Sequence, residues 1–590
     1  MKKCPQCGRE YDLSMSFCLD DGAELLYGPA KSEPPVSAGG QVGEPETAIL
    51  YSTAAPGEAP TRAQIDTTEQ TAIFPGGAEP EPLESLGGLS EKHSFSANRA
   101  AKPLIAAAAA VLVLVGGFFG YRHFSSSGST QINSIAVLPF ENRSGNTDTD
   151  YLSDGLADSL IYRLAQLPNL KVSPTSSVMR YKGKSGDTLQ IAKDLNVDAV
   201  MSGRLVQIGD SLNISVQLTD ARTDKLIWAE QYDRKLSDLL ATQREIAAAI
   251  ADKLKLKLSG NDQKGLTKTF TDNNEAYQSY LRGRFYWNKR TRDGIDNGIA
   301  FFQKAIDLDP NFALAYVGLA DSYSVMPSYG YMSPAEALSR ATTAIQQGLQ
   351  IDPDLAEAHS TYGLVLASQW RWSEAETEFK RALEIDPKSA ESHYKYAIQF
   401  LEPVGRFDDA IREMETALEL DPLSIPIGAN LAGVYVYYRK YDAGLEQAQK
   451  VYALDPGHAT AIIWLANAYE GKEKYDEAIK LCETSLRSLP DNQDLLLIMG
   501  SSYARSGRPE QTRPIISKLE NMAKTQYVSF YRIASLYGDL GEKDHAFSAL
   551  EKAYEEQDWE ITRLKVDPFM DALRDDPRYK ELLKRINLAE

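Results

Sequence analysis

Residues 352–387 read DPDLAEAHSTYGLVLASQWRWSEAETEFKRALEIDP, and this stretch decides the fold of the second half of the chain. It opens and closes with an Asp-Pro pair. After one longer first interval, prolines recur about every 34 residues, at Pro310, Pro353, Pro387, Pro422, Pro456 and Pro490. Proline cannot donate a helical hydrogen bond and disfavours helix at the residue before it, so each proline marks the end of a helix. A fixed period of this length indicates a helical solenoid.

Small and large apolar residues recur in phase with the prolines. The corresponding positions of two consecutive intervals are Gly363, Ala375, Phe379 and Ala382, then Ala397, Ala410, Met414 and Ala417. Small residues let the two helices of one hairpin approach closely, and large ones pack against the next hairpin. The sequence therefore predicts a stack of helix–turn–helix units.

This pattern resembles the tetratricopeptide repeat, and the resemblance covers residues 273–557 in about eight helical hairpins. The interval from Pro310 to Pro353 carries extra residues around Pro327 to Tyr331, which predict a longer turn between two helices. Residues 558–590 are expected to form a capping helix, from Leu564 to Ile586, with a polar outer face. A solenoid needs such a cap to end its core.

The resemblance implies a concave groove, lined mainly by the first helix of each hairpin, that binds proteins or peptides. By their phase, Tyr394, Tyr437 and Asn467 are expected to face this groove. Each is alternatively an ordinary packing or solvent-facing residue. His359 and His393 occupy the fourth position of their repeats, where a bulky side chain packs between helices, so core filling is favoured over metal binding.

Length, charge and motifs limit the possible functions. A chain of 590 residues is too long for one core, so a multidomain protein is expected. The net charge of −19 argues against a general role in nucleic-acid binding, which requires basic surface. The sequence contains no His-Glu-x-x-His motif and no Gly-x-Ser-x-Gly elbow. We therefore predict that the protein is not an enzyme and has no catalytic residue.

The amino terminus carries two cysteine knuckles, Cys4-Pro5-Gln6-Cys7-Gly8 and Phe17-Cys18-Leu19-Asp20-Asp21-Gly22. This is the ligand arrangement of a zinc ribbon, except that Asp21 replaces the fourth cysteine, and zinc accepts carboxylate oxygen. Residues 1–27 are thus predicted to hold a structural Zn²⁺ through Cys4, Cys7, Cys18 and Asp21, with Asp20 a poorer candidate by spacing. Free cysteines in a flexible tail are the alternative. However, so short a segment cannot fold on buried surface alone.

A linker and an apolar segment follow. Residues 28–98 are rich in Pro, Gly, Ala, Ser, Thr and Glu without a hydrophobic period, which indicates a disordered linker. Residues 103–122 carry no charge from Pro103 to Tyr121. As a helix this stretch spans about 28 Å, close to the roughly 30 Å of a bilayer core. It is predicted to be a single transmembrane helix, since a buried soluble helix is rarely apolar on every face.

The charges around this helix predict its orientation. Lys92, Arg99 and Lys102 precede it, whereas only Arg122 closely follows. The positive-inside rule then places the amino terminus in the cytoplasm and the remaining domains outside it. Gly116 and Gly120 form a Gly-x-x-x-Gly pair through which two anchors would pack as a weak homodimer.

Residues 132–258 alternate between strand and helix patterns. Expected strands are Ile135 to Phe140, Leu170 to Val172, Ala199 to Leu205, Leu212 to Leu218 and Leu226 to Tyr232. Expected helices are Tyr151 to Leu167, Leu189 to Leu195 and Leu239 to Leu258. This alternation predicts a compact α/β domain.

Three sequence segments of this domain resemble the amino-terminal domain of TolB and the related FlgO-like domains. They are Ile135–Phe140 followed by Glu141-Asn142-Arg143-Ser144-Gly145, then Tyr151-Leu152-Ser153-Asp154-Gly155-Leu156, then Leu226-Ile227-Trp228-Ala229-Glu230-Gln231-Tyr232-Asp233. The resemblance implies a bacterial envelope or sensory architecture and passes on no catalytic activity.

Together these features predict a single-pass protein of the bacterial cytoplasmic (inner) membrane. Its zinc ribbon lies in the cytoplasm, and its α/β domain and all-α solenoid lie outside, where the groove binds protein or peptide partners as a scaffold or sensor. One alternative is a non-catalytic subunit of a nucleotide cyclase or kinase signalling system. Another is a cytoplasmic regulator whose ribbon contacts nucleic acid, which requires that the predicted anchor does not span a membrane.

Overall fold

The computed structural model describes residues 2–3, 10–11 and 132–589, without residues 168, 185–186, 257 and 328–331 and without the side chains of residues 2, 3, 10, 11, 261, 262 and 264. The chain divides into two units, Met1–Ala106 and Ala107–Glu590. In the first unit, strand β1 (Lys2–Lys3) pairs antiparallel with β2 (Glu10–Tyr11). The predicted zinc ligands Cys4, Cys7, Cys18 and Asp21, the linker 28–98 and the Gly116/Gly120 pair lie outside the described residues.

The predicted membrane span, residues 103–122, also lies outside them. Of the helices in the described part of the chain, none combines the length and apolar character needed to cross a membrane. The described residues 132–589 belong to the second unit.

The α/β domain begins the described part of this unit. Its strands are β3 (Ser134–Val137), β4 (Glu141–Asn142), β5 (Lys171–Val172), β6 (Ala199–Ile208), β7 (Ser211–Asp220) and β8 (Lys225–Lys235). Its helices are η1 (Thr147–Thr149), α2 (Asp150–Ala165), α3 (Thr175–Val178), η2 (Met179–Tyr181), α4 (Thr188–Leu195), η3 (Leu236–Asp238) and α5 (Leu239–Lys253). Helix α6 (Gly260–Thr267) leads toward the repeats. The predicted strands and helices are therefore present, whereas the sequence did not predict β4, η1, α3, η2, η3 and α6.

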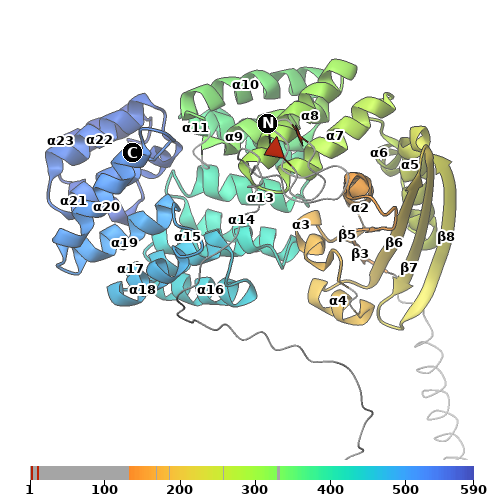
Figure 1. The fold of residues 1–590 in the computed structure, drawn as a ribbon, viewed down its shortest axis with the longest axis horizontal. Coiled ribbons are helices and arrows are strands. Elements are labelled where there is room, and N and C mark those ends of the chain that lie inside the picture. Colours follow the sequence, from red (N-terminus) through yellow and green to blue (C-terminus); the bar gives the residue numbers. More distant parts are fainter. Residues whose placement is uncertain are drawn as a thin grey trace, which may run out of the picture. The chain divides into compact units, whose positions relative to one another are not determined.

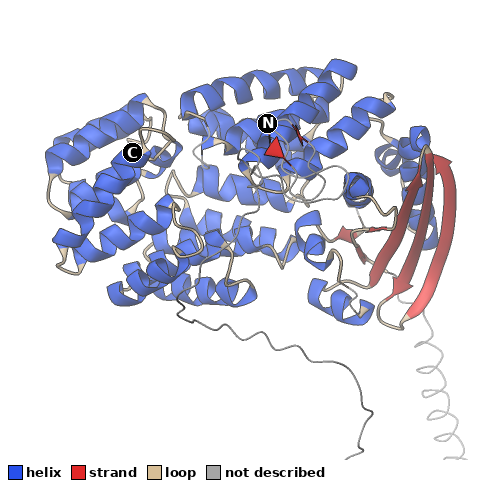
Figure 2. Cartoon of the chain, in the orientation of Figure 1, coloured by secondary structure: helices blue, strands red, loops and turns tan. Residues whose placement is uncertain are grey.

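The sheet is mixed, with strand order β5-β3-β6-β7-β8 and β4 paired to β6. Strands β5, β3 and β6 run parallel, with Ile135 opposite Val172 and Ala199, whereas β6, β7 and β8 form an antiparallel meander. In β7, the buried Leu212, Ile214, Val216 and Leu218 alternate with polar residues. This alternation makes one face of the sheet apolar, and the helices lie on one side of it (Figure 2).

Eight helical hairpins make up the described solenoid (Figure 1). Their helices are α7 (Asn274–Trp287) and α8 (Arg292–Leu308), α9 (Ala313–Val325) and α10 (Pro334–Ile351), α11 (Ala356–Ser368) and α12 (Trp372–Ile385), α13 (Ala390–Tyr396) and α14 (Phe407–Leu420), α15 (Ile425–Tyr437) and α16 (Tyr441–Leu454), α17 (Ala459–Gly471) and α18 (Tyr475–Ser485), α19 (Gln493–Arg505) and α20 (Pro509–Met522), and α21 (Phe530–Asp539) and α22 (Lys543–Glu555).

Small residues allow the close approach of helices that the repeat pattern predicts. Phe302 of α8 is fully buried between Gly283 of α7 and Gly318 of α9. A Cβ added at either glycine would come within 2.6 Å of the Phe302 ring. Larger residues there would force the helices apart, which explains the small residues at these contacts.

One repeat contains a local irregularity. The interval from Pro387 to Pro422 is one residue longer than the intervals on either side. The extra residue is absorbed in the first helix of that hairpin, because α13 continues into a π-helical turn, η5 (Ala397–Leu401). A π-helical turn holds one more residue than an α-helical turn, so the neighbouring hairpins keep their phase.

The histidines at the fourth repeat position fill space between helices and also form hydrogen bonds. His359 Nδ1 lies 2.6 Å from Glu378 Oε2 and its Nε2 lies 2.8 Å from the carbonyl oxygen of Pro353. Burial lowers the pKa of His359, but these two hydrogen bonds raise it more, so the net shift is upward. His393 repeats this arrangement with Glu413 and the Pro387 carbonyl. Each histidine thus ties its first helix to the second helix and to the preceding Asp-Pro turn.

Candidate functional site

The α/β domain docks on the edge of the solenoid that is formed by the Asp-Pro turns. The hydroxyls of Ser176 and Ser177, in α3, donate to the carboxylate of Asp421, and Arg180 Nη2 donates to the carbonyl oxygen of Leu423 at 2.9 Å. Asp421 is only 3% exposed. Burial raises its pKa and outweighs the two serine hydrogen bonds, which lower it.

Two earlier turns take part in the same contact. Lys388, just after the Asp386-Pro387 pair, donates through Nζ to the carbonyl oxygen of Leu167 at 3.0 Å. Lys268, in the segment that joins α6 to α7, pairs with Asp352 at 2.7 Å. The 34-residue spacing thus presents three successive turns to the amino-terminal part of this unit, and α3 lies beside this edge in Figure 1.

The residues after the last hairpin form three short helices instead of the predicted single capping helix. They are η6 (Trp559–Arg563), η7 (Pro568–Leu573) and α23 (Pro577–Arg585), and we call residues 559–588 the C-terminal segment. Asp567 and Asp576 cap the last two helices, and Pro568 and Pro577 occupy their first positions. Two prolines that start helices divide a stretch that would otherwise continue as one helix.

The C-terminal segment packs onto the solenoid instead of extending it. Leu564, Met570, Leu573, Leu582 and Ile586 are at most 1% exposed. They share one apolar cluster with residues of η5 and α15, namely Leu401, Leu431 and Val434. Burial of five such side chains stabilises this packing by about 7–15 kcal/mol as an upper bound. The segment is therefore an integral part of the fold.

Polar contacts fix the segment on the turns between first and second helices. Arg563 Nε pairs with Glu402 Oε1 at 2.8 Å, and the two side chains are 6% and 2% exposed. Trp372 Nε1 donates to the carbonyl oxygen of Ile586 at 2.8 Å. At the next hairpin, Arg439 forms two hydrogen bonds with Asp571, at 2.6 and 2.7 Å. These contacts lie on the edge opposite the Asp-Pro turns, because they involve the other end of each hairpin.

The structure places the three predicted groove residues beneath other side chains. Tyr437 is 2% exposed, and the guanidinium of Arg563 lies 5.8 Å from its ring centre. Asn467 is 1% exposed and donates to the carbonyl oxygen of Ile463 in its own helix. Tyr394 is half-buried, and its hydroxyl accepts from Asn430 Nδ2 at 3.1 Å. All three lie on first helices, as predicted. The expectation that Tyr437 and Asn467 face an open groove is wrong, because packing within the chain buries them.

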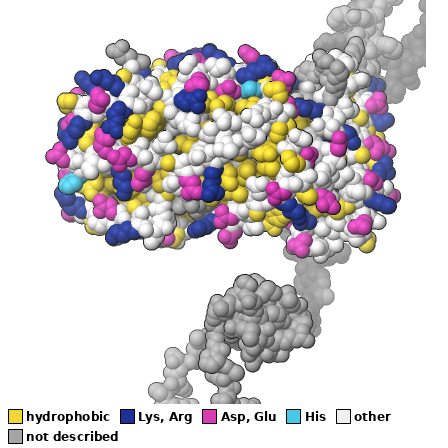
Figure 3. All heavy atoms as spheres, turned by 90° about the horizontal axis from the view of Figure 1, so that it is seen from above, with side chains coloured by type: hydrophobic (Ala, Val, Ile, Leu, Met, Phe, Trp, Pro, Cys, Tyr) yellow, Lys and Arg dark blue, Asp and Glu magenta, His cyan; other side chains and the backbone are white. Residues whose placement is uncertain are grey.

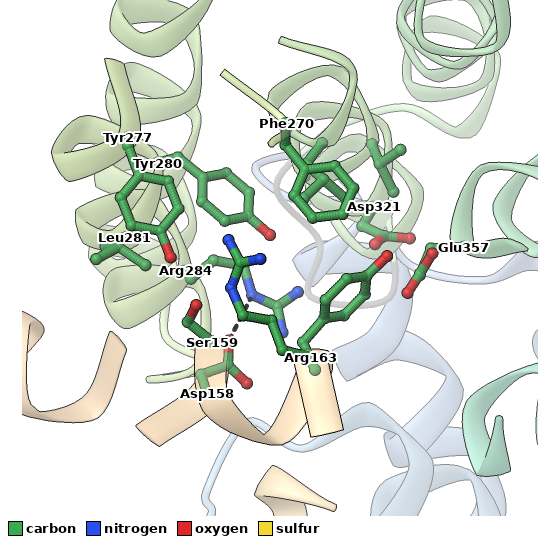
Figure 4. Close-up of a pocket in the computed structure, with 14 residues that line it drawn as sticks. Asp158, Ser159, Arg163, Phe270, Tyr277, Tyr280, Leu281, Arg284, Asp321 and Glu357 are labelled. Carbon is green, nitrogen blue, oxygen red and sulfur yellow. Dashed lines mark ion pairs between the residues drawn. The ribbon is translucent and has the colours of Figure 1, made fainter. Parts of the chain in front are cut away.

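A cavity of about 120 Å³ is present at the first three hairpins. It is enclosed by α2, by Phe270, and by the first helices α7, α9 and α11 (Figure 4). Two arginines, Arg163 and Arg284, and three carboxylates contribute to its wall. The aromatic side chains of Tyr162, Phe270, Tyr277 and Tyr280 form another part of the wall, and small or aliphatic residues complete the lining. Sequence analysis did not predict this site, since its residues come from helices far apart in the chain.

One sequence signal indicated the real shape of the C-terminal segment. The Asp-Pro pairs at Asp567-Pro568 and Asp576-Pro577 are much closer together than the repeat spacing. An Asp-Pro pair can begin a helix as well as follow one, since Asp is a good N-cap and Pro suits the first helical position. The docking of α3 on Asp421 had no comparable signal, because serines and aspartates are frequent on any surface.

Comparison with family models confirms the repeats. Residues 356–389, 430–511 and 527–557 match tetratricopeptide repeat models. Residues 130–249 match the model of the second domain of HilA/YgeH-like transcriptional regulators. The second unit thus combines a tetratricopeptide solenoid, a class of protein-interaction scaffold, with an α/β domain. The TolB and FlgO resemblance of that domain stays a prediction.

Relatives cover parts of the chain. A curated protein of Rhizobium meliloti (strain 1021), "Putative adenylate cyclase 3", is 29% identical over 239 residues, which are 40% of this chain and 40% of that protein. The chain therefore spans less than half the length of this relative.

Two solved structures resemble the repeats at TM-scores below 0.5. Similarity at this level says nothing about function. Pseudomonas aeruginosa PilF is 19% identical, with 37% of this chain and 96% of PilF covered and a TM-score of 0.29. A tetratricopeptide repeat protein of Parabacteroides merdae is 16% identical, with 46% of this chain and 98% of that protein covered and a TM-score of 0.32.

The buried pair of Glu402 and Arg563 gives a test of the C-terminal packing. Burial raises the pKa of Glu402 to about 7, although Arg563 opposes this shift. Arg563→Met would leave a buried carboxylate without a partner, and we expect it to lower the free energy of unfolding by about 3–5 kcal/mol at pH 8. The loss should be smaller at pH 5.5, where Glu402 becomes protonated and neutral. Denaturant titration of the purified chain at both pH values measures this difference.

The matched control is Arg412→Met, which removes an ion pair with Asp409 whose arginine side chain is 64% exposed. This change should lower the free energy of unfolding by at most about 1 kcal/mol at either pH. Equal losses in the two variants would show that Arg563 does not hold the C-terminal segment in a buried site.

Proposed function

We propose that this protein is a membrane-anchored protein-interaction scaffold whose solenoid binds a partner along the Asp-Pro edge. One observation carries the proposal: this edge already binds a polypeptide, since α3 and its neighbours dock on three successive turns. The next turn in the series, Asp455 to Gly457, is exposed. Beside it, Leu454 is 54% exposed, which is unusual for a large apolar side chain in the described part of this chain.

The contacts of the α/β domain indicate what chemistry such a partner presents. Ser176 and Ser177 offer hydroxyls to Asp421, and Arg180 offers a guanidinium to a turn carbonyl. A protein surface with hydroxyl and cationic donors next to an apolar residue would fit Asp455 and Leu454 in the same way. Acidic and basic side chains are interspersed among the described residues of the face in Figure 3, so this face offers no continuous basic band for nucleic acid.

The amino-terminal features of the sequence support a location at a membrane. In this proposal residues 103–122 span the cytoplasmic membrane once, and the ribbon of residues 1–27 lies in the cytoplasm with Zn²⁺ held by Cys4, Cys7, Cys18 and Asp21. The support is the uncharged length of the segment and the positive charges that precede it. The solenoid and the α/β domain are then extracytoplasmic. The TolB-like segments of the α/β domain agree with an envelope location.

A second function, within a nucleotide cyclase system, is favoured by the 29% identity to a protein named as an adenylate cyclase. Here the chain would act as a non-catalytic subunit whose solenoid contacts the cyclase. A third, in which the chain is a cytoplasmic regulator with a nucleic-acid-contacting ribbon, draws support from the HilA/YgeH-like match. These three functions differ in the partner bound and in the side of the membrane on which it is bound.

Site-specific photocrosslinking tests the partner surface. A photoreactive amino acid in place of Leu454 should give a crosslinked protein in native cells, whereas one in place of Leu226, which is 59% exposed in the α/β domain, should not. Asp455→Lys should abolish the product, because it replaces the acceptor with a cation. Glu477→Lys, on the exposed surface of α18, is the matched charge reversal and should leave it unchanged. Crosslinks of equal yield at positions 454 and 226 would contradict the proposal, and identification of a cyclase by mass spectrometry would favour the second function.

Reporter fusions test the topology. Alkaline phosphatase, which is active only outside the cytoplasm, should be active when fused after Glu590 and inactive when fused after residue 98. A fluorescent protein that matures only in the cytoplasm should show the reverse. Cytoplasmic fluorescence of the Glu590 fusion would overturn the membrane proposal and favour the cytoplasmic regulator.

Metal analysis tests the ribbon. The purified chain should contain about one zinc per molecule, as expected for one closed four-ligand site. Cys7→Ser should remove the zinc, whereas Cys482→Ser should retain it, because Cys482 is fully buried within the solenoid and its pKa is raised to about 12 by burial. Zinc retained in the Cys7→Ser variant would exclude the proposed ligand set.

A further inference from the structure

The cavity between α2 and the first three hairpins has the size of a small-molecule site. Its volume is about 120 Å³. An engineered cavity of about 150 Å³ in another protein holds benzene, which has six non-hydrogen atoms, so this smaller one has room for about five or six non-hydrogen atoms. Tyr162 and Phe270 meet in its wall with ring centres 5.4 Å apart in an edge-to-face arrangement. Together with Tyr277 and Tyr280, four aromatic side chains thus contribute to the wall.

Two of the charges in the wall are neutralised by neighbours. Asp158 lies 3.6 Å from Arg284 Nε and accepts a hydrogen bond from Thr175. Asp321 accepts from the hydroxyl of Thr361 at 2.8 Å, and the Nζ of Lys395 lies 3.3 Å from the same carboxylate. These groups contribute polarity to the cavity, but little net charge.

Arg163 carries a positive charge that the chain does not balance. Its side chain is 3% exposed, and its Nη1 donates to the carbonyl oxygens of Leu266 and Lys268, both at 3.0 Å. Its Nε has no hydrogen-bond partner among the described residues. No carboxylate of the described chain lies within ion-pair distance of it. An arginine buried in this way is costly unless an anion compensates it.

Glu357 carries the complementary negative charge. It belongs to the first turn of α11 and lines the same cavity (Figure 4). Within the described chain, no lysine, arginine or histidine lies at ion-pair distance from its carboxylate. The cavity therefore contains one unbalanced cation and one unbalanced anion, separated by aromatic side chains.

We infer that this cavity binds a small zwitterion of the amino-acid class, with its carboxylate at Arg163, its ammonium at Glu357 and its carbon chain against Tyr162, Phe270 and Tyr280. Arg163 presents a guanidinium, the preferred partner of a carboxylate. The faces of the tyrosines also favour an ammonium group. The inference is independent of the proposed scaffold function, because it concerns a different surface and a different class of ligand.

Affinity should depend on pH through Glu357. The pKa of Glu357 is raised to about 7, mainly by burial and also by Asp386 and Asp321, whereas a backbone hydrogen bond and Arg284 act to lower it. Tyr162 of α2 faces the same carboxylate. Since only the ionised carboxylate pairs with an ammonium, affinity should be full above about pH 8 and should fall as the pH decreases through 7.

Calorimetric titration of the purified full chain tests the inference. The probes are alanine, an α-amino acid, and β-alanine, in which the two charges are further apart. Propanoate and propylamine, which each keep one charge, are the comparison compounds. At least one zwitterion should bind at least about tenfold more tightly than both comparison compounds, and the preferred zwitterion reports the charge spacing. The inference is overturned if neither zwitterion binds at about 10 mM, or if a singly charged compound binds equally well.

A matched pair of variants locates the site. Glu357→Gln should weaken binding of the preferred zwitterion at least about tenfold at pH 8 and remove its pH dependence. It disrupts no ion pair of the described chain, so the fold should persist, which circular dichroism verifies. Glu384→Gln, an exposed change on α12, should leave binding unchanged. Unchanged binding in the Glu357→Gln variant would show that the ammonium is not held there. Loss of the partner crosslink at Leu454 would bear only on the scaffold proposal.

Discussion

A helical hairpin of this solenoid cannot bury all of its own apolar surface. Neighbouring hairpins, α2 and the C-terminal segment cover the apolar surface that remains. At the first hairpins, α2 packs against α7, and Phe302 is enclosed between glycines of α7 and α9. At the later hairpins, the C-terminal segment adds Met570, Leu582 and Ile586 to the cluster that contains Leu401. The α/β domain and the solenoid consequently belong to one compact unit. The regular spacing of the turns makes both contacts possible, since it lines up equivalent groups along each edge.

The sequence determined much of this architecture because its strongest signals are local and periodic. The prolines and the phased small residues predict the hairpins, and the alternation in β7 predicts the strand. Even the π-helical turn η5 corresponds to one extra residue between Pro387 and Pro422. No periodic pattern in the sequence predicted that α2 and the C-terminal segment cover the apolar surface of the hairpins. Contacts such as Arg563 with Glu402 join residues that are far apart in the chain, and neither residue type identifies its partner.

Because these segments cover the hairpins, binding sites are expected at other positions than the predicted groove. Tyr437 and Asn467 were correctly assigned to first helices, but the side chains around them leave no open groove at these positions. What the described solenoid exposes instead is the continuation of its Asp-Pro edge, at Leu454 and Asp455. What it encloses is a small charged cavity beside Glu357. A protein partner and a small ligand would therefore use separate sites, one on the surface and one at the junction with α2.

The C-terminal segment is a folded part of the solenoid, so its backbone amides should be protected from solvent. Hydrogen–deuterium exchange of the purified full chain, followed by mass spectrometry, measures this protection. Amides of residues 561–586 should exchange as slowly as those of α15 and α17. Exchange of these amides at the rate of an unstructured peptide, while α15 and α17 stay protected, would contradict this expectation.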